Sequence, residues 1–239
     1  MQNNYENPIH LSQASVGSQT ANFMSRVYGW MASGVAMSGL VAYGIFQNTA
    51  LTMALLQNRG AFMGMMIVQF ALVIGLSAAM NRISSTVAGL LFYLYSAITG
   101  VTLSVMFLIY TQDSIFSMFF LTAFSFAGLS AVGYTTKKDL GPVASFCMMG
   151  LFGMVGYTLI SFFFPSMMGG GASMVMGAVG ILVFSGLTAY DTQKIKAMYT
   201  QGQYGAEGER KLAISGALAL YLDFINLFLS LLRVFGRRR

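Results

Sequence analysis

The chain has 239 residues, of which 56% are hydrophobic and only 8% are charged, and its mean hydropathy is +0.68. Soluble domains carry roughly 25% charged residues, so this composition excludes a water-soluble globular fold and indicates a protein whose solvent is lipid. The formal net charge of +6 comes from basic residues near the ends of apolar runs, which is typical of a membrane topology signal and gives no nucleic-acid-binding surface.

The chain begins with a polar segment, and no apolar signal sequence precedes Arg26. We expect residues 1–25 to form a disordered or loosely surface-bound tail. Residues 26–236 are predicted to form one transmembrane domain, and residues 237–239 a basic C-terminal tail. The single Cys147 excludes an intrachain disulfide, and with one His it excludes a His/Cys zinc site.

Apolar runs of near-spanning length then follow one another, and a helix needs roughly 20 such residues to cross a bilayer. Backbone groups in lipid must be hydrogen-bonded within the segment, so each run is predicted to be a helix. The sequence therefore predicts an all-α polytopic membrane protein with seven transmembrane helices, over the runs Val27–Asn48, Ala61–Met80, Val87–Tyr110, Ile115–Tyr134, Val143–Phe164, Ala172–Thr192 and Leu212–Val234.

The basic residues are divided unequally between the two sides of such a bundle. One side carries Arg26, Arg82, Lys137, Lys138, Lys194, Lys196, Arg210 and Lys211, and the other carries Arg59, Arg233, Arg237, Arg238 and Arg239. The loop bias predicts a cytoplasmic N-terminus and a C-terminus on the outer side. The arginine-rich tail runs against this bias, so the alternative is that one run does not span and the tail is cytoplasmic.

Two carboxylates, Asp191 and Asp223, lie within or at the end of the last two apolar runs. An ionised Asp in the middle of a bilayer costs several kcal/mol, so it is normally protonated, paired or used. Helical spacing places Asp223 on one face of the seventh run, together with Ser215, Ala219, Asn226 and Ser230. Thr188 and Asp191 form a similar stripe on the sixth run. Both stripes are expected to face the bundle interior or a wet cavity.

If the last two helices are neighbours, Asp191 and Asp223 can meet, although the sequence leaves open whether their depths match. Two carboxyls close together in a low dielectric cannot both ionise cheaply, so such a pair holds a shared proton and titrates as a unit. Thr188, Asn226 and Ser230 are candidates for lining a pore, and Ca²⁺ is expected to bind the pair only transiently. The alternative is that each Asp merely fixes helix packing.

Arg82 closes the second run on the same side as Asp191. It is expected either to anchor the helix at the headgroups or to act as a latch that pairs with Asp191 in one gating state.

The segments AYDTQKIK (Ala189–Lys196) and LALYLDFINLFLSLLRVFG (Leu218–Gly236) resemble the Bax inhibitor-1 family, in particular its bacterial inner-membrane branch. The resemblance implies a seven-helix bundle with the seventh helix surrounded by the others. It also implies a pH-sensitive calcium leak gated by Asp191 and Asp223, with Arg82 as the latch. Some members carry an acidic residue earlier in the second helix, where this chain has Gln69.

We therefore expect a pH-sensitive calcium or cation leak channel of the bacterial inner membrane, with no enzymatic activity and no cofactor beyond weakly bound Ca²⁺. The expected partners are the lipid bilayer, Ca²⁺ or other cations, and a membrane protein. The alternative is a regulator of membrane-protein turnover or stress response that transports nothing. An intramembrane aspartyl protease is disfavoured because Tyr221-Leu222-Asp223 stands where Gly-x-Gly-Asp is required.

Overall fold

The structure is a computed structural model that describes residues 13–80, 82–164 and 170–239. These residues are helical apart from loops, turns and one isolated β-bridge. The helices, in chain order, are α1 (Gln13–Phe46), α2 (Thr49–Gln57), α3 (Arg59–Ala79), α4 (Ser85–Ser104), α5 (Met106–Ile109), α6 (Gln112–Thr135), α7 (Gly141–Phe163), α8 (Gly170–Gln201) and α9 (Ala206–Phe235).

Polar residues between the apolar runs mark where several helices begin. The side chains of Asn48, Ser84 and Thr111 each accept a hydrogen bond from the backbone N–H three residues on, at the starts of α2, α4 and α6. Such caps satisfy backbone donors that have no partner within the helix. Pro142 lies in the first turn of α7, where its missing N–H costs nothing.

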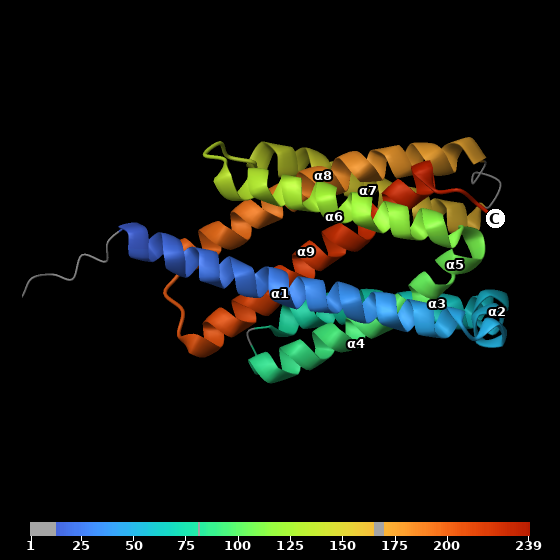
Figure 1. Cartoon of the computed structure of the whole chain (residues 1–239), viewed down its shortest axis with the longest axis horizontal. Coiled ribbons are helices and arrows are strands. Elements are labelled where there is room, and N and C mark those ends of the chain that lie inside the picture. Colours follow the sequence, from blue (N-terminus) through green and yellow to red (C-terminus); the bar gives the residue numbers. More distant parts are fainter. Residues whose placement is uncertain (1–12, 81, 165–169) are drawn as a thin grey trace, which may run out of the picture.

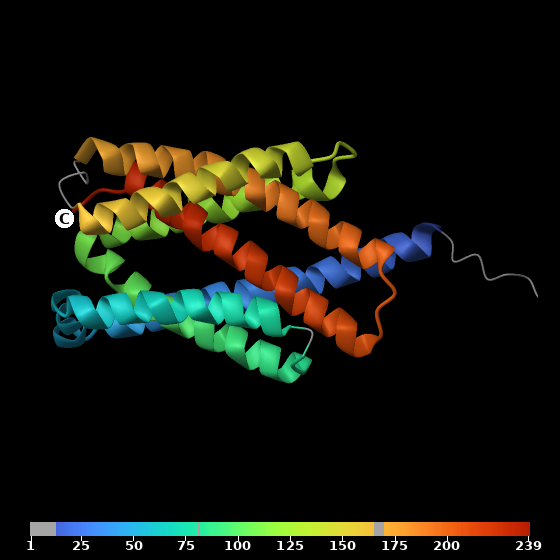
Figure 2. The same cartoon turned by 180° about the vertical axis from the view of Figure 1, so that it is seen from behind.

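The long helices run back and forth between the two ends of an elongated bundle (Figure 1). Helices α1, α3 and α4 lie together on one side, and α6, α7 and α8 lie together on the other. Helix α9 crosses diagonally between the two groups, as the view from behind also shows (Figure 2). It contacts α1, α4, α6 and α8, and 72% of its most apolar window is buried, against 39% or less for the other spans.

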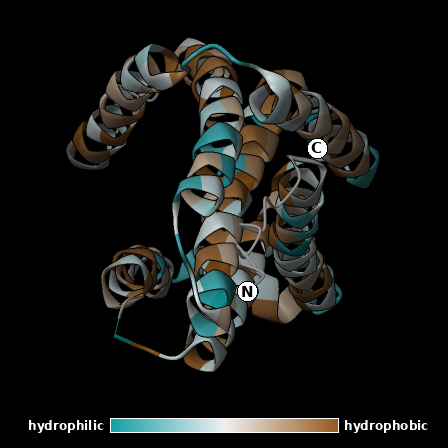
Figure 3. Ribbon diagram, turned by 90° about the vertical axis from the view of Figure 1, so that its left-hand side faces the viewer, coloured by the Kyte–Doolittle hydropathy of each residue, from teal (hydrophilic) through white to brown (hydrophobic). Residues whose placement is uncertain are grey.

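By length and composition, six of the described helices can cross a membrane: α1, α4 with α5, α6, α7, α8 and α9. The described apolar part of α3, Met63–Ala79, is shorter. Hydrophobic segments occur on the outside of the bundle as well as between the helices (Figure 3). The prediction of an all-α, multi-pass membrane protein is therefore confirmed, and the described helices include six of the seven predicted spans.

The first helix starts earlier than the polar composition of residues 1–25 suggested. Helix α1 begins at Gln13, so residues 13–25 are helical, while residues 1–12 lie outside the described part of the chain. Phe23 and Met24 are buried, and the Phe23 ring stacks on Tyr199 of α8 with 4.2 Å between the ring centroids. Packing against α8, which the chain's local composition does not reveal, therefore orders this segment.

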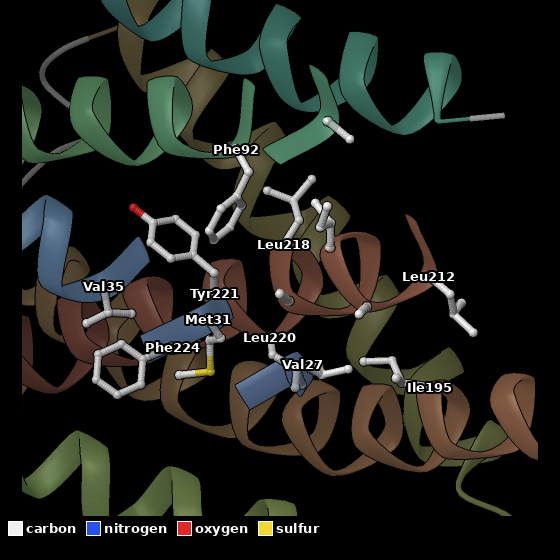
Figure 4. Close-up of a cluster of buried hydrophobic side chains, with 14 of the residues drawn as sticks. Val27, Met31, Val35, Phe92, Ile195, Leu212, Leu218, Leu220, Tyr221 and Phe224 are labelled. Atoms are coloured by element: carbon white, nitrogen blue, oxygen red, sulfur yellow. The ribbon is translucent and has the colours of Figure 1, made fainter. Parts of the chain in front are cut away.

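The core gathers around α9. Side chains of α9, such as Leu220 and Tyr221, point between neighbouring helices, where Val27 and Phe92 meet them (Figure 4). The Tyr221 hydroxyl forms a 2.7 Å hydrogen bond with Ser38 Oγ of α1. The face of α9 that carries Tyr221 is thus fixed to α1 and α4, which leaves Asp223, two residues on, to face the other group of helices.

Helices α6 and α8 approach closely at Gly133, where an added Cβ would collide with the backbone of Ala189. Gly128, one and a half turns earlier on α6, has open space around its Cβ position. The contact at Gly133 lies two residues from Asp191 and fixes the position of α8 along α6.

We expect Gly133→Ala to destabilise the protein by about 1–3 kcal/mol because of overpacking. For a chain of this size this corresponds to a fall in Tm of about 2–4 °C per kcal/mol. Gly128→Ala, on the same helix, is the matched control and should leave Tm unchanged or raise it slightly, since Ala favours helix more than Gly. Thermal unfolding in detergent measures both, and equal Tm values for the two variants would contradict the close contact.

Candidate functional site

Asp223 lies in the middle of α9 and is only 4% exposed. Its Oδ2 atom is buried, and no hydrogen-bond donor reaches it in the described part of the chain. A buried polar atom without a partner is rare in proteins and points to strain, to a missing ion or proton, or to function.

Asp191 is the partly buried partner on α8. The side chains of Asp191 and Asp223 lie within hydrogen-bonding reach of each other. Helix α8 continues ten residues past Asp191 to Gln201, or about 15 Å at 1.5 Å per residue. The sequence left open whether Asp191 and Asp223 lie at matching depths. Because α8 extends this far, Asp191 lies well inside the helix and can meet Asp223 in the middle of α9.

Ionised carboxylates only accept hydrogen bonds, so two neighbouring carboxyl groups can form a hydrogen bond with each other only if one of them carries a proton. Their proximity in a mostly apolar environment therefore fits a pair that holds one proton between its oxygens. Two further titratable groups act electrostatically on the pair: Lys194 of α8 on Asp191, and the Cys147 thiol of α7 with Asp223.

Lys194 is a site residue that was predicted only as one of the basic residues that set the topology. Its ammonium acts on Asp191 and lies 5.8 Å from the ring centroid of Tyr190. The signal was present in the sequence, because residues three apart on a helix are neighbours. Lys194 therefore places a positive charge one turn from Asp191 on the same helix.

The residues that follow Asp191 bind α8 to α6. Thr192 is fully buried, and its hydroxyl donates to Thr188 O at 2.8 Å and lies 3.4 Å from Ser130 Oγ of α6. Lys196 Nζ donates to Tyr134 O in the last turn of α6 at 2.8 Å. A cation at this position satisfies a carbonyl at a helix C-terminus and complements the helix dipole.

Gln193 binds the loop between α6 and α7. Its Nε2 donates to Lys138 O at 2.8 Å, and its Oε1 accepts from Leu140 N at 3.0 Å. The segment from Asp191 to Lys196 therefore presents one carboxylate to α9 and attaches the rest of α8 to α6 and its following loop.

The three residues predicted to line a pore are hydrogen-bonded within their own helices in this conformation. Thr188, Asn226 and Ser230 each donate a hydrogen bond to the carbonyl four residues earlier in their own helix. Ser230 also packs directly against Gly180 of α8, where an added Cβ would collide with its hydroxyl. Helices α8 and α9 are thus also in tight contact at Gly180, which precedes Asp191 along α8.

Arg82 is exposed in the turn between α3 and α4, and the structure does not bring it to Asp191. Within the described residues, the ion pair formed is that of Arg26 with Glu209. The role of Arg82 as a latch in another gating state stays a prediction.

Gln69, which stands where some family members have an acid, donates to Thr99 Oγ1 at 3.0 Å and to Thr102 Oγ1 at 3.3 Å. It therefore joins α3 to α4, away from the carboxyl pair.

No group of three or more His, Cys, Asp or Glu side chains in the described part of the chain is placed to hold a metal ion. Ca²⁺ takes 6–8 oxygen ligands, and two carboxylates offer at most four. The arrangement suits transient contact with a cation better than a resident ion.

Comparison with known proteins agrees with the family resemblance. The sequence model of the family described as "Inhibitor of apoptosis-promoting Bax1" matches residues 20–239. An inner membrane protein of Escherichia coli K12, YbhL, is 46% identical over 231 residues, which cover 95% of each chain. An uncharacterised protein of Borreliella burgdorferi is 44% identical over 217 residues, 91% of this chain and 92% of its own. An uncharacterised membrane protein of Streptococcus pyogenes serotype M1 is 37% identical over 232 residues. The chain therefore belongs to the Bax inhibitor-1 family.

Proposed function

We propose that the protein is a pH-sensitive cation leak channel, with Ca²⁺ as the principal ion, and that the Asp191–Asp223 pair is its gate. The observation that carries the proposal is the buried contact of the two carboxyl groups between α8 and α9, with no donor reaching Asp223 Oδ2 among the described residues. A buried carboxyl oxygen without a donor supports a titrating role for the pair.

At acidic pH, one proton is shared by the pair and holds α8 against α9. As the pH rises the proton is lost, and two like charges in direct contact repel by on the order of a few kcal/mol at an effective dielectric constant of 20. Lys194 offsets part of this repulsion from the α8 side, and the neutral Cys147 thiol offsets none of it. The repulsion favours separation of α8 from α9, which would open the tight contact at Ser230 and expose Thr188 and Asn226.

The same two carboxylates would then attract a cation. An ionised pair with polar groups from Thr188 and Asn226 gives weak, hard-oxygen coordination that suits passage and release. This role needs no catalytic group and no cofactor, so we propose transport and not catalysis.

In this proposal the chain crosses the membrane seven times. Helices α1 and α4 both run from the end where α1 begins to the opposite end (Figure 1). Since both can cross a membrane, α3 has to return the chain across it between them. The loops at the end where α1 begins carry most of the basic residues, so we place this end in the cytoplasm of a bacterial inner membrane.

A topology reporter fused after Arg239 tests this orientation. It should score on the outer side of the membrane, and the same reporter placed in the loop between α6 and α7 should score in the cytoplasm. A cytoplasmic score at both positions would mean that one of the helices does not span.

Purified protein in liposomes should pass Ca²⁺ faster at about pH 8 than at about pH 5, because the pair ionises as the pH rises. In Asp191→Asn and Asp223→Asn the second charge cannot form, so flux should stay near the acidic level of the wild type at every pH. Asp113→Asn removes an exposed carboxylate at the end of the bundle and serves as the matched control, which should keep the wild-type pH response.

Equal flux at all pH values, or unchanged pH dependence in both pair variants, would contradict the gate. Absence of flux from folded wild-type protein would contradict the channel itself, and would favour a regulatory membrane protein that transports nothing.

A further inference from the structure

A lipid-facing cavity of about 400 Å³ lies on the other side of α9 from Asp191. Its walls are the second half of α1 and the first half of α6, and α9 forms its floor through Phe224, Ile225 and Phe228. Leu40 and Phe120 at its margin are 73% and 69% exposed, so the cavity opens sideways between α1 and α6. We refer to it below as the α1–α6 groove.

The volume of the groove falls in the range of sites that hold small molecules. In a protein whose outer surface meets lipid, the molecule that reaches a sideways opening is an acyl chain. An apolar lining alone does not retain one lipid in preference to another, because lipid tails are as apolar as the groove. Selectivity requires a polar feature at the end of the groove.

The C-terminal residues supply such a feature. The backbone of this segment is fixed beside the start of α6: Thr111 N donates to Arg237 O at 3.0 Å, Arg237 N donates to Ser114 Oγ at 2.9 Å, and Arg239 N donates to Ile109 O at 3.0 Å. The predicted basic tail, residues 237–239, is therefore a docked segment.

The side chains of Arg237, Arg238 and Arg239 are exposed, and within the described residues none of them forms a salt bridge. Asp113, which precedes Ser114 at the docking position on α6, is itself exposed. The guanidinium of Arg239 lies 5.8 Å from the ring centroid of Phe46, and that ring stacks on Phe107 of the groove wall at 4.9 Å. Three exposed arginines thus follow one another in the docked segment, and the guanidinium of Arg239 lies beside a ring that packs on the groove wall.

We infer that the α1–α6 groove and the docked arginines together bind one anionic phospholipid, with an acyl chain along Phe224 and Phe228 and the phosphate at the guanidinium groups. Guanidinium is the side chain best suited to phosphate, since its N–H donors match two phosphate oxygens at once. The lipid comes from the leaflet at the end of the bundle where α9 finishes. This site is independent of the proposed channel gate.

Quenching of a tryptophan by brominated phospholipids tests the site in vesicles. In the full chain carrying Trp30→Phe, Phe120→Trp places the reporter at the mouth of the groove, and Phe152→Trp places a matched reporter on the lipid-facing side of α7. Phe120 and Phe152 are 69% and 68% exposed, so they differ chiefly in their distance from the groove. Each protein is reconstituted in phosphatidylcholine with the same fraction of brominated phosphatidylglycerol or brominated phosphatidylcholine.

At the Phe120 position, brominated phosphatidylglycerol should be preferred by roughly five-fold for each arginine near the headgroup, because both lipids carry a phosphate but only phosphatidylglycerol has a net negative charge. At the Phe152 position the two lipids should quench equally. Changing Arg237, Arg238 and Arg239 together to Gln should abolish the preference at Phe120, and these exposed side chains can be replaced without disturbing the backbone contacts of the segment.

Gly39→Leu tests the groove itself, because Gly39 lines it and has open space at its Cβ position. This variant should reduce quenching at Phe120 by both lipids, whereas Gly44→Leu, which also has open space but does not line the groove, should not. Equal quenching by both lipids at Phe120 would overturn the inference. So would a preference for phosphatidylglycerol at Phe152 as large as that at Phe120, or a preference at Phe120 that survives loss of the three arginines. If Gly39→Leu does not fold, the arginine variant decides alone.

Discussion

A carboxyl group in the middle of apolar helices has to be neutral, paired or solvated, and Asp223 imposes this requirement on the whole bundle. It is carried by the most buried helix, which runs between two groups of helices and has little freedom to turn its polar face outward. The partner has to come from a neighbouring helix at the same depth. Helix α8 provides Asp191 because it passes α9 in the opposite direction and extends well beyond that point.

The side chains that follow Asp191 attach α8 to α6 by hydrogen bonds. Thr192, Lys196 and the close approach at Gly133 all join α8 to α6, and Gln193 extends the attachment to the following loop. Contact with α9 depends instead on packing and on the carboxyl pair. We therefore expect loss of the proton to weaken the contact between α8 and α9 at the carboxyl pair.

Much of this structure follows from apolar run lengths and helical spacing. The runs predicted the helices, and the polar stripe around Asp223 predicted that it faces inward. The sequence could not show that α8 continues past Asp191, since the polar residues after Thr192 resemble the start of a loop. It also could not show that residues 13–25 continue α1, because packing of Phe23 on Tyr199 decides this. Lys194 was recoverable from its spacing to Asp191, whereas the docking of residues 237–239 depends on a contact between distant segments.

The proposed shared proton can be tested directly by infrared spectroscopy of the reconstituted protein across a pH titration. The account predicts a protonated-carboxyl carbonyl band in the wild type that persists to higher pH than the bands of exposed carboxyls. The band should be lost in Asp223→Asn and shifted in frequency in Asp191→Asn, because the proton then has a different hydrogen-bond partner. A wild-type spectrum without such a band, or a band that is identical in Asp191→Asn, would contradict the shared proton and with it the gate.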